Sequence, residues 1–170
     1  GDNSIEDEGA AALSEALKSN VTLETLELRK NKIGVAGAQS LADMLQANRS
    51  LNALDLSQNN IGGVSVYVKK GQLQGASFKK GDTVQYKGQQ CIVFKEEDSD
   101  GVLEVESRSG VIALAEALKF NRALKSVDLR NNRIPDEGKQ QLRGAVNLHI
   151  TLRLGPAGRY SYSAPHTYIH

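Results

Sequence analysis

The sequence has one cysteine, almost no net charge and no long hydrophobic run, and each of these absences excludes a class of protein. Cys91 is the only cysteine among 170 residues, so no disulfide can form within the chain, which favours a reducing, cytoplasmic compartment. The formal net charge of +1 provides no overall field that would attract nucleic acid or an anionic membrane. No apolar run approaches the roughly 18 residues of a membrane span, and the first residues show no signal peptide. We therefore expect neither a membrane nor a nucleic acid as the partner.

The residue patterns of catalytic and metal sites are missing as well. Asp98–Gly101 reads D-S-D-G, which is only a fragment of a calcium loop, and we expect a hairpin turn there. Among the three histidines, His166 and His170 are four residues apart, but the flanking prolines and glycines do not make a helix that could hold zinc, and His149 is separate from them. No serine–histidine–aspartate order, glycine-rich phosphate loop or pair of acids in a pocket can be recognised. We therefore expect no enzyme, no metal and no cofactor.

The chain does contain one spacing of leucine and asparagine that occurs three times. It is clearest in Leu51–Ile61, which reads L-N-A-L-D-L-S-Q-N-N-I and fits the pattern L-x-x-L-x-L-x-x-N-x-I. Residues 23–33 and 124–134 follow the same spacing, with a valine at one leucine position of the latter. Leu41 and Leu45, four residues apart, predict a helix over about residues 35–46 after the first of these segments. Each unit is therefore predicted to be a short strand followed by a helix.

The repeat has a period of 28 residues and one long interruption. Ile5, Ile33 and Ile61 follow one another at this interval, whereas Ile134 lies 73 residues after Ile61. About 45 extra residues therefore interrupt one unit. The resulting division is repeats at 1–63, an insert at 64–108, repeats at 109–154 and an irregular tail at 155–170. The register slips in the last unit, where Leu154 falls one residue short of the predicted place.

The insert changes from a helical to an alternating period. Val64, Val66 and Val68 would lie on one face of a strand, and further β-branched and aromatic runs follow. Lys87–Gly88 is a turn signal between two of these runs. Four or five short strands over this length predict a small antiparallel, barrel-like insert, since a lone hairpin would be marginal. Lysines dominate its first part and acids its last part, so the two would neutralise each other if their strands pair.

The repeats resemble a known family. The period and the pattern N-x-I-x-x-x-G-A-x-x-L-A-x-x-L-x-x-N-x-x-L are similar to the ribonuclease-inhibitor-like leucine-rich repeats, which include those of NOD-like receptors and of the Ran GTPase-activating protein. The resemblance covers roughly residues 2–62 and 109–154 and implies an α/β solenoid with a concave parallel sheet and convex helices. It implies protein binding on the concave sheet and the loop edges, and it transfers no catalytic residue. The insert resembles SH3-like and Tudor-like barrels through F-K-K-G-D-T-V-Q-Y-K-G.

The side chains between the leucines should face the concave side, because strand side chains alternate. Glu27, Asp55 and Asp128 then form an acidic column suited to a protein with a basic surface. The alternative is a solvated sheet face whose charges pair sideways. The predicted partner-binding residues are Thr25, Glu27, Arg29, Asp55, Ser57, Asp128 and Arg130.

The function predicted from these patterns is a scaffold or recognition module that binds another protein. One alternative is a GTPase-regulating protein of the Ran activator type. Another is a reader of a modified peptide or nucleic acid, in which aromatic residues of the insert form a cage. Those residues are Tyr67, Phe78, Tyr86 and Phe94, although so small a barrel needs its aromatics first as core, which is the favoured interpretation.

Two further expectations concern the structure of the repeats. Asn31, Asn59 and Asn132 should bind backbone groups in the turn after each strand, as a structural ladder. The first helix, around Leu13, has no strand before it in the sequence, so the strand near Leu26 should be an open edge. We expect self-association or a docked partner at that edge.

Overall fold

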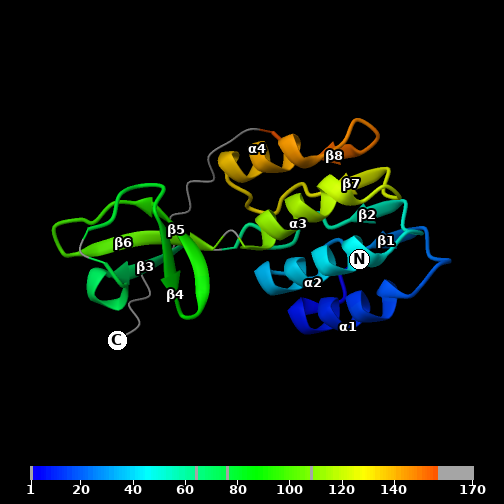
Figure 1. Cartoon of the computed structure of the whole chain (residues 1–170). Coiled ribbons are helices and arrows are strands. Elements are labelled where there is room, and N and C mark those ends of the chain that lie inside the picture. The colour runs from blue at the N-terminus through cyan, green and yellow to red at the C-terminus, as the bar shows by residue number, and fades with distance from the viewer. Residues whose placement is uncertain (1, 64, 76, 108, 157–170) are drawn as a thin grey trace.

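The protein contains two separate sheets, one of them covered by helices. The computed structural model describes residues 2–63, 65–75, 77–107 and 109–156 (Figure 1). The first sheet has four strands in the order β1-β2-β7-β8, and the second has four in the order β3-β6-β5-β4. The elements of the first part are α1 (Glu6–Lys18), β1 (Thr25–Glu27), α2 (Val35–Ala47), β2 (Ala53–Asp55), α3 (Ser109–Phe120), β7 (Ser126–Asp128), α4 (Asp136–Ala145) and β8 (Thr151–Arg153). Those of the insert are β3 (Ser65–Lys69), the 3-10 helix η1 (Lys70–Gln72), β4 (Thr83–Tyr86), β5 (Gln89–Lys95) and β6 (Val102–Ser107).

The first sheet is parallel throughout and carries its four helices on one face (Figure 1). Leu26 is aligned with Leu54, and Leu54 with Val127, so the repeat spacing sets the strand register. Alternate side chains point to the helices and form the core, in which Leu56 and Leu129 are buried. The predicted strand–helix units are therefore confirmed. The face of this sheet that the helices leave uncovered is called the open face below.

The asparagines after the strands form the expected ladder. The Asn59 Oδ1 accepts hydrogen bonds from the N–H groups of Asn31 and Ile33, at 2.9 and 3.0 Å. Its Nδ2 donates to the carbonyl oxygens of Leu28 and Leu56, both at 2.9 Å. One buried side chain thus satisfies backbone groups of two units, which would be costly to leave unpaired.

A second asparagine ladder runs along the ends of the helices. The Nδ2 of Asn48 donates to the carbonyl oxygen of Leu17 in the preceding helix, at 2.8 Å, and its Oδ1 accepts from the N–H of Leu51, at 2.8 Å. Asn121 repeats the first contact on the carbonyl of Leu45, at 2.7 Å. These asparagines join each helix end to the next unit, a role that their place after a helix did not indicate.

Within the described residues the second sheet is antiparallel, and its two outer strands do not pair with each other. Its strands β3 and β4 are the two outer strands of the order, so the closed barrel that the alternating pattern suggested is not confirmed. The predicted turn at Lys87–Gly88 is confirmed, because both residues have left-handed φ angles, 48° and 76°, as a two-residue hairpin turn requires. The turn at Asp98–Gly101 is confirmed as well, since the Asp98 Oδ1 accepts from the N–H of Val102 at 3.0 Å.

The insert has its own hydrophobic core, separate from that of the repeats. Cys91 is buried in it, as predicted, and burial raises the pKa of its thiol. The Lys70 Nζ lies 2.8 Å from the Glu97 Oε2, so a lysine of η1 meets an acid of the loop between β5 and β6. The buried members of this core are Val68, Leu73, Phe78, Val84, Cys91, Val93, Leu103 and Val105.

The chain leaves the repeats and returns to them at adjacent points. A Cβ added at Gly63 would lie 2.9 Å from the carbonyl oxygen of Ser107 and 3.1 Å from the Val35 Cγ2. One added at Gly110 would lie 3.0 Å from the carbonyl oxygen of the same Val35. The four strands of the second sheet lie between these points, within the predicted 64–108.

The register of the last strand differs from the one that the leucine spacing predicted. Leu152, not Leu154, is aligned with Val127. The helix α4 has 10 residues whereas α3 has 12, and this shortening brings the strand forward. As a consequence β8 adds Arg153 to the open face, directly opposite Asp128.

Candidate functional site

The open face of the first sheet brings the predicted acidic residues into one row. The strand register places Glu27 opposite Asp55, and Asp55 opposite Asp128. Their surroundings differ, because Glu27 is exposed, Asp55 is half-buried and Asp128 is only 9% exposed. The row therefore offers two accessible acids, Glu27 on β1 and Asp55 on β2.

Asp128 is held by Arg130 and is not the solvent-facing acid that the spacing predicted. The Arg130 Nε donates to the Asp128 Oδ2 at 2.9 Å, and the backbone N–H of Arg130 donates to Oδ1 at 3.0 Å. Burial raises the pKa of Asp128, but the hydrogen bonds and charge of Arg130 outweigh burial, so the pKa is lowered overall. The carboxylate in turn raises the pKa of Arg130.

Arg153 is a member of the row that the sequence did not reveal. It continues the line after Asp128, and its charge also helps to lower the pKa of that carboxyl. The signal that could have located it is the alternation in L-R-L, but the register slip concealed its alignment. The open face consequently carries two accessible acids, Glu27 and Asp55, followed by the Asp128–Arg130 ion pair and then by Arg153.

Of the remaining predicted partner-binding residues, two are exposed and one is buried. Thr25 and Arg29 are exposed on the same strand edge as Glu27. Ser57 is buried, and its N–H donates to the Asp55 Oδ1 at 2.8 Å. Ser57 therefore shapes the strand end and offers no contact surface.

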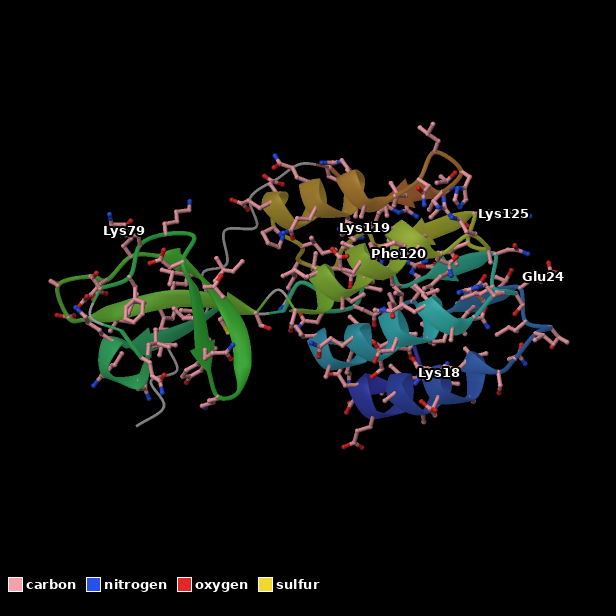
Figure 2. The ribbon with its side chains drawn as sticks, in the orientation of Figure 1. Lys18, Glu24, Lys79, Lys119, Phe120 and Lys125 are labelled. Atoms are coloured by element: carbon pink, nitrogen blue, oxygen red, sulfur yellow. The ribbon has the colours of Figure 1, made fainter. Side chains whose placement is uncertain are left out.

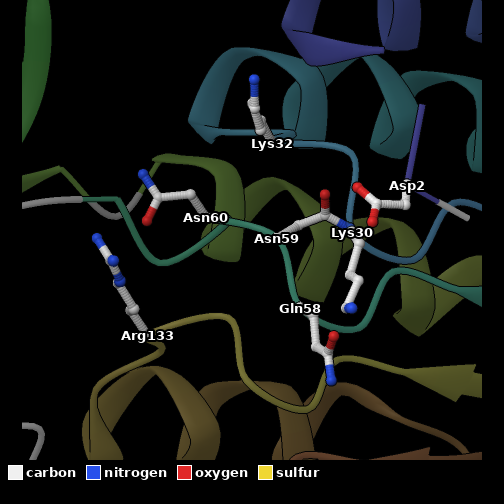
Figure 3. A pocket seen from close by; sticks show the side chains of 7 residues that line it. All are labelled: Asp2, Lys30, Lys32, Gln58, Asn59, Asn60 and Arg133. Carbon is white, nitrogen blue, oxygen red and sulfur yellow. The ribbon is translucent and has the colours of Figure 1, made fainter. Parts of the chain in front are cut away.

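An open pocket adjoins this face where the strands turn toward the helices (Figure 3). Its volume is about 550 Å³, and its cations are Lys30, Lys32 and Arg133. Lys32 also lies 3.7 Å from the Glu6 Oε1, a surface ion pair. The residues lining the pocket are Asp2, Lys30, Lys32, Gln58, Asn59, Asn60 and Arg133. We refer to it as the turn pocket.

The backbone of these turns explains why their side chains project outward together. Left-handed φ angles between 54° and 58° recur at equivalent positions of successive turns. Such angles are costly for residues other than glycine and reverse the chain within a few residues. The residues concerned are Lys30, Lys32, Gln58, Asn131 and Arg133. Because the ladder asparagine lies between them and is buried, the long flanking side chains are directed to solvent.

The described aromatic side chains of the insert, those of Tyr67, Phe78 and Tyr86, differ in burial and are not gathered into one cage. Tyr67 is 62% exposed and lies opposite Glu104 in the strand register, whereas Phe78 belongs to the buried core. Tyr86 is half-buried against the same core, and the Lys87 Nζ lies 5.4 Å from its ring centroid. The side chain of Phe94 lies outside the described side chains.

Within residues 2–63, 65–75, 77–107 and 109–156, no group of three or more histidine, cysteine or acidic residues is arranged to hold a metal ion. His149 is exposed, while His166 and His170 lie outside the described residues. None of the helices in residues 2–156 that the structure describes has the length and apolar character to traverse a bilayer.

Comparison with known proteins identifies the repeats. The sequence model of the Leucine Rich repeat family matches residues 19–42, 47–67 and 120–140, which contain β1, β2 and β7. The second match runs into β3, where the insert takes the place of a helix. Repeats of this family generally mediate protein–protein interaction and are typically non-enzymatic. No curated protein matches the chain.

Proposed function

We propose that this chain is a protein-interaction module that docks its partner on the open face of the parallel sheet. The observation that carries this proposal is the row of charged side chains that four strands hold in register at the strand ends, next to the turn pocket. Such a face is rigid, because buried asparagines fix the turns on which it depends. Leucine-rich repeats detected on three of these strands support protein recognition over catalysis.

The charge pattern suggests how the partner is oriented. Glu27 and Asp55 favour a basic surface opposite β1 and β2, while Arg153 favours an acidic one opposite β8. Arg29 and the lysines of the turn pocket extend the contact around the strand ends. Charge complementarity of this kind affects the association rate and its salt dependence more than the affinity.

We also propose a subclass for the repeats, a cellular role for the chain and a domain type for the insert. The 28-residue period supports the ribonuclease-inhibitor-like subclass, whose members curve into a solenoid with this face on the concave side. We infer a scaffold or recognition role in the cytoplasm, with the insert as an attached module of small β-domain type.

The test removes the two accessible negative charges of the open face without disturbing the turns. The variant combines Glu27→Lys with Asp55→Asn, since asparagine retains an oxygen for the N–H of Ser57. Its matched control is Glu24→Lys, a change of an exposed acid just before β1, at the rim where helices end (Figure 2). Affinity capture from cell extract at low and high salt should lose its partner with the first variant only.

Two outcomes would contradict the proposal. One is capture of the same proteins by the folded double variant as by the unchanged chain, and the other is an equal loss of capture in the Glu24→Lys control. An insert-deleted chain serves as the third arm. Loss of capture in that arm alone would transfer the binding function to the insert.

A further inference from the structure

The turn pocket lies along equivalent positions of successive turns. The residues before and after each ladder asparagine project beside those of the next turn, because strands β1, β2 and β7 are in register. The positions before the asparagine hold Asp2, Lys30, Gln58 and Asn131, and those after it hold Ser4, Lys32, Asn60 and Arg133. The lining residues include three cations and one acid, so the pocket attracts negative charge.

The middle turn makes a hollow in this row of side chains. Lys32 and Arg133 are exposed, whereas Asn60 between them is half-buried and uncharged. Lys32 and Arg133 have left-handed φ angles of 57° and 54°, but Asn60 does not, and the chain leads from it into the insert instead of a helix. Figure 3 shows the two cations on either side of Asn60, where they do not converge on one point. The pocket is therefore elongated, with positive charge toward each end.

The two lysines of the pocket are accessible, and their backbone is fixed. The Lys32 Nζ lies 3.7 Å from the Glu6 Oε1, but the two side chains remain 68% and 61% exposed, and such a surface pair contributes little. Lys30 is exposed as well, and its backbone N–H donates to the carbonyl oxygen of Ser57 at 3.1 Å. The turn thus presents its charges to a ligand from a rigid support.

The spacing of the cations indicates an extended anion. The turns after β1 and β7 are two strand positions apart, which puts the backbones of Lys32 and Arg133 about 10 Å from each other. One phosphate or carboxylate group is too small to contact both without drawing the two side chains together. In an extended peptide, alternate side chains lie on one face about 7 Å apart, and two carboxylates with this spacing reach both cations.

The residues between the cations favour a peptide over a nucleic acid. Gln58 and Asn60 present amide groups, which both donate to and accept from peptide groups. The buried Asn60 Oδ1 has no hydrogen-bond partner within the described residues, so a rotation that offers it to a peptide N–H would satisfy it. None of the described residues that line the pocket is aromatic, whereas single-stranded nucleic acids bind largely by stacking their bases on aromatic rings.

We propose that the turn pocket binds an extended acidic segment of a protein partner, with acidic residues at alternate positions. The segment crosses the turns from the β1 side to the β7 side. One carboxylate lies between Lys30 and Lys32, and the next reaches Arg133. This site is distinct from the acidic row of the open face, and it rests on the proposed function only in that the segment belongs to a protein partner.

A fluorescein-labelled peptide, Gly-Ser-Glu-Ser-Glu-Ser-Gly, tests the proposal with the whole chain. Its fluorescence anisotropy should rise to saturation at low salt and much less at high salt, because exposed charges are screened. The same peptide with glutamine in place of both glutamates should not bind. Absence of saturable binding at low salt, or equal binding of the glutamine peptide, would overturn the proposal.

Two competitors test the choice of ligand. Inorganic phosphate supplies a single anion, and a short oligothymidylate supplies a row of phosphates with bases. Both should displace the labelled peptide only in large excess. Displacement by phosphate at a concentration equal to that of the unlabelled peptide would refute an extended ligand, and the same result with the oligothymidylate would transfer the site to nucleic acid.

Substitutions to asparagine at left-handed positions locate the site. Asparagine adopts these φ angles readily, so charge is removed without straining the turns. Lys30→Asn and Lys32→Asn should each weaken peptide binding by about threefold, as loss of one exposed ion pair does. Asp2→Asn should strengthen binding, because it removes the acid of the pocket. The matched control is Lys87→Asn, at an exposed lysine of the insert with a φ of 48°, which should leave binding unchanged.

Two results of this series would contradict the assignment. One is equal weakening in the Lys87→Asn control, which would indicate attraction to the whole chain. The other is unchanged binding in both variants of the pocket lysines. Circular dichroism would verify that each variant remains folded.

Backbone amide NMR during the peptide titration gives a readout that needs no variant. Shift changes should concentrate at residues 30–33, 58–61 and 131–134, and changes concentrated in the insert or on the open face would refute the site. The double variant Glu27→Lys with Asp55→Asn should lose its captured partner and still bind the peptide. Failure of the peptide to bind the unchanged chain, with capture still dependent on the open face, would overturn this inference alone and leave the proposed function standing.

Discussion

The two sheets of this protein differ in how their turns are fixed. In the parallel sheet, a buried asparagine in one unit binds backbone groups in its neighbour, as Asn59 does with Ile33. In the insert, the turns are local, as at Lys87–Gly88, where two residues reverse the chain. The comparison shows that a parallel array with no hairpins needs side chains to link its units, whereas an antiparallel sheet obtains the same linkage from its turns.

The largest effect should come from breaking the ladder. Asn59→Ala leaves the N–H groups of Asn31 and Ile33 and the carbonyl group of Leu28 without their partner, and it removes one of the two hydrogen bonds to the carbonyl group of Leu56, which Asn132 also binds. At about 1 kcal/mol for each of the four lost hydrogen bonds, the loss amounts to about 4 kcal/mol of unfolding free energy. Denaturant unfolding measures it. A cost below that of Leu56→Ala in the same experiment would mean that water replaces the amide easily.

A core substitution in the insert should have a large effect that stays local. Leu103 is buried in the core of the second sheet, so Leu103→Ala should cost about 3 kcal/mol there. Because the repeats have a separate core, amide hydrogen exchange should accelerate in β3 to β6 and remain slow in β2 and β7. Equal acceleration in both sheets would show that they unfold as one unit.

Substitution of Gly62, which lies between the repeats and the insert, should have a smaller, steric effect on stability. A Cβ at Gly62 would lie 2.3 Å from the carbonyl oxygen of Arg133, so Gly62→Ala should cost about 2 kcal/mol through displacement of the next turn. The control is Gly144→Ala in α4, which meets nothing within 4 Å and should stabilise the helix slightly. Thermal unfolding distinguishes them by the sign of the change in Tm.

The Asp128–Arg130 pair should make the stability of the repeats depend on pH. The pKa of Asp128 is lower when folded than when unfolded, so its contribution is present above the ordinary aspartate pKa and is lost as pH falls through the folded value. Between neutral pH and about pH 3 the unchanged chain should lose more stability than Asp128→Asn. Parallel pH profiles of the two proteins would contradict this.

The smallest effect should come from relieving turn strain. Gln58 has a φ of 57°, a conformation that asparagine adopts more readily. Gln58→Asn should stabilise the repeats by less than about 1 kcal/mol, and Lys87→Asn, with a φ of 48°, should do the same for the insert. High-precision denaturant titrations would detect both. A loss of stability in either variant would show that the original side chain makes contacts that outweigh the strain.

The sequence was sufficient for the recurring strand and turn, and insufficient for contacts that depend on how helices stack or on a single change of register. Leu54 and Asn59 could be placed because their spacing appears three times, and the insert could be bounded because the period resumes after it. Asn48 was visible only as the end of a helix, since its bond to Leu17 depends on how two helices stack. Arg153 was missed because a shorter helix α4 changed the register once.

Other differences reflect geometry that alternation does not encode. An alternating pattern indicates which side chains are buried, but it does not specify whether the outer strands close on each other, so the open second sheet could not be predicted. The exposed ring of Tyr67 agrees with the alternation of its strand, in which Val66 and Val68 contact the core, so the expectation that this aromatic residue belongs to the core was wrong. The pairing of Asp128 by Arg130 depends on burial, which spacing alone does not provide.

The adjacency of Gly63 and Ser107 makes this point of the chain a natural site for grafting. A folded segment costs its host little when its two ends already lie together, because the host loses almost no freedom in closing the loop around it. The present insert meets that condition with ends that both pack near Val35. Any other small domain whose termini are neighbours could therefore be exchanged at this point, which would turn the repeats into a carrier for binding or reporter modules of chosen specificity.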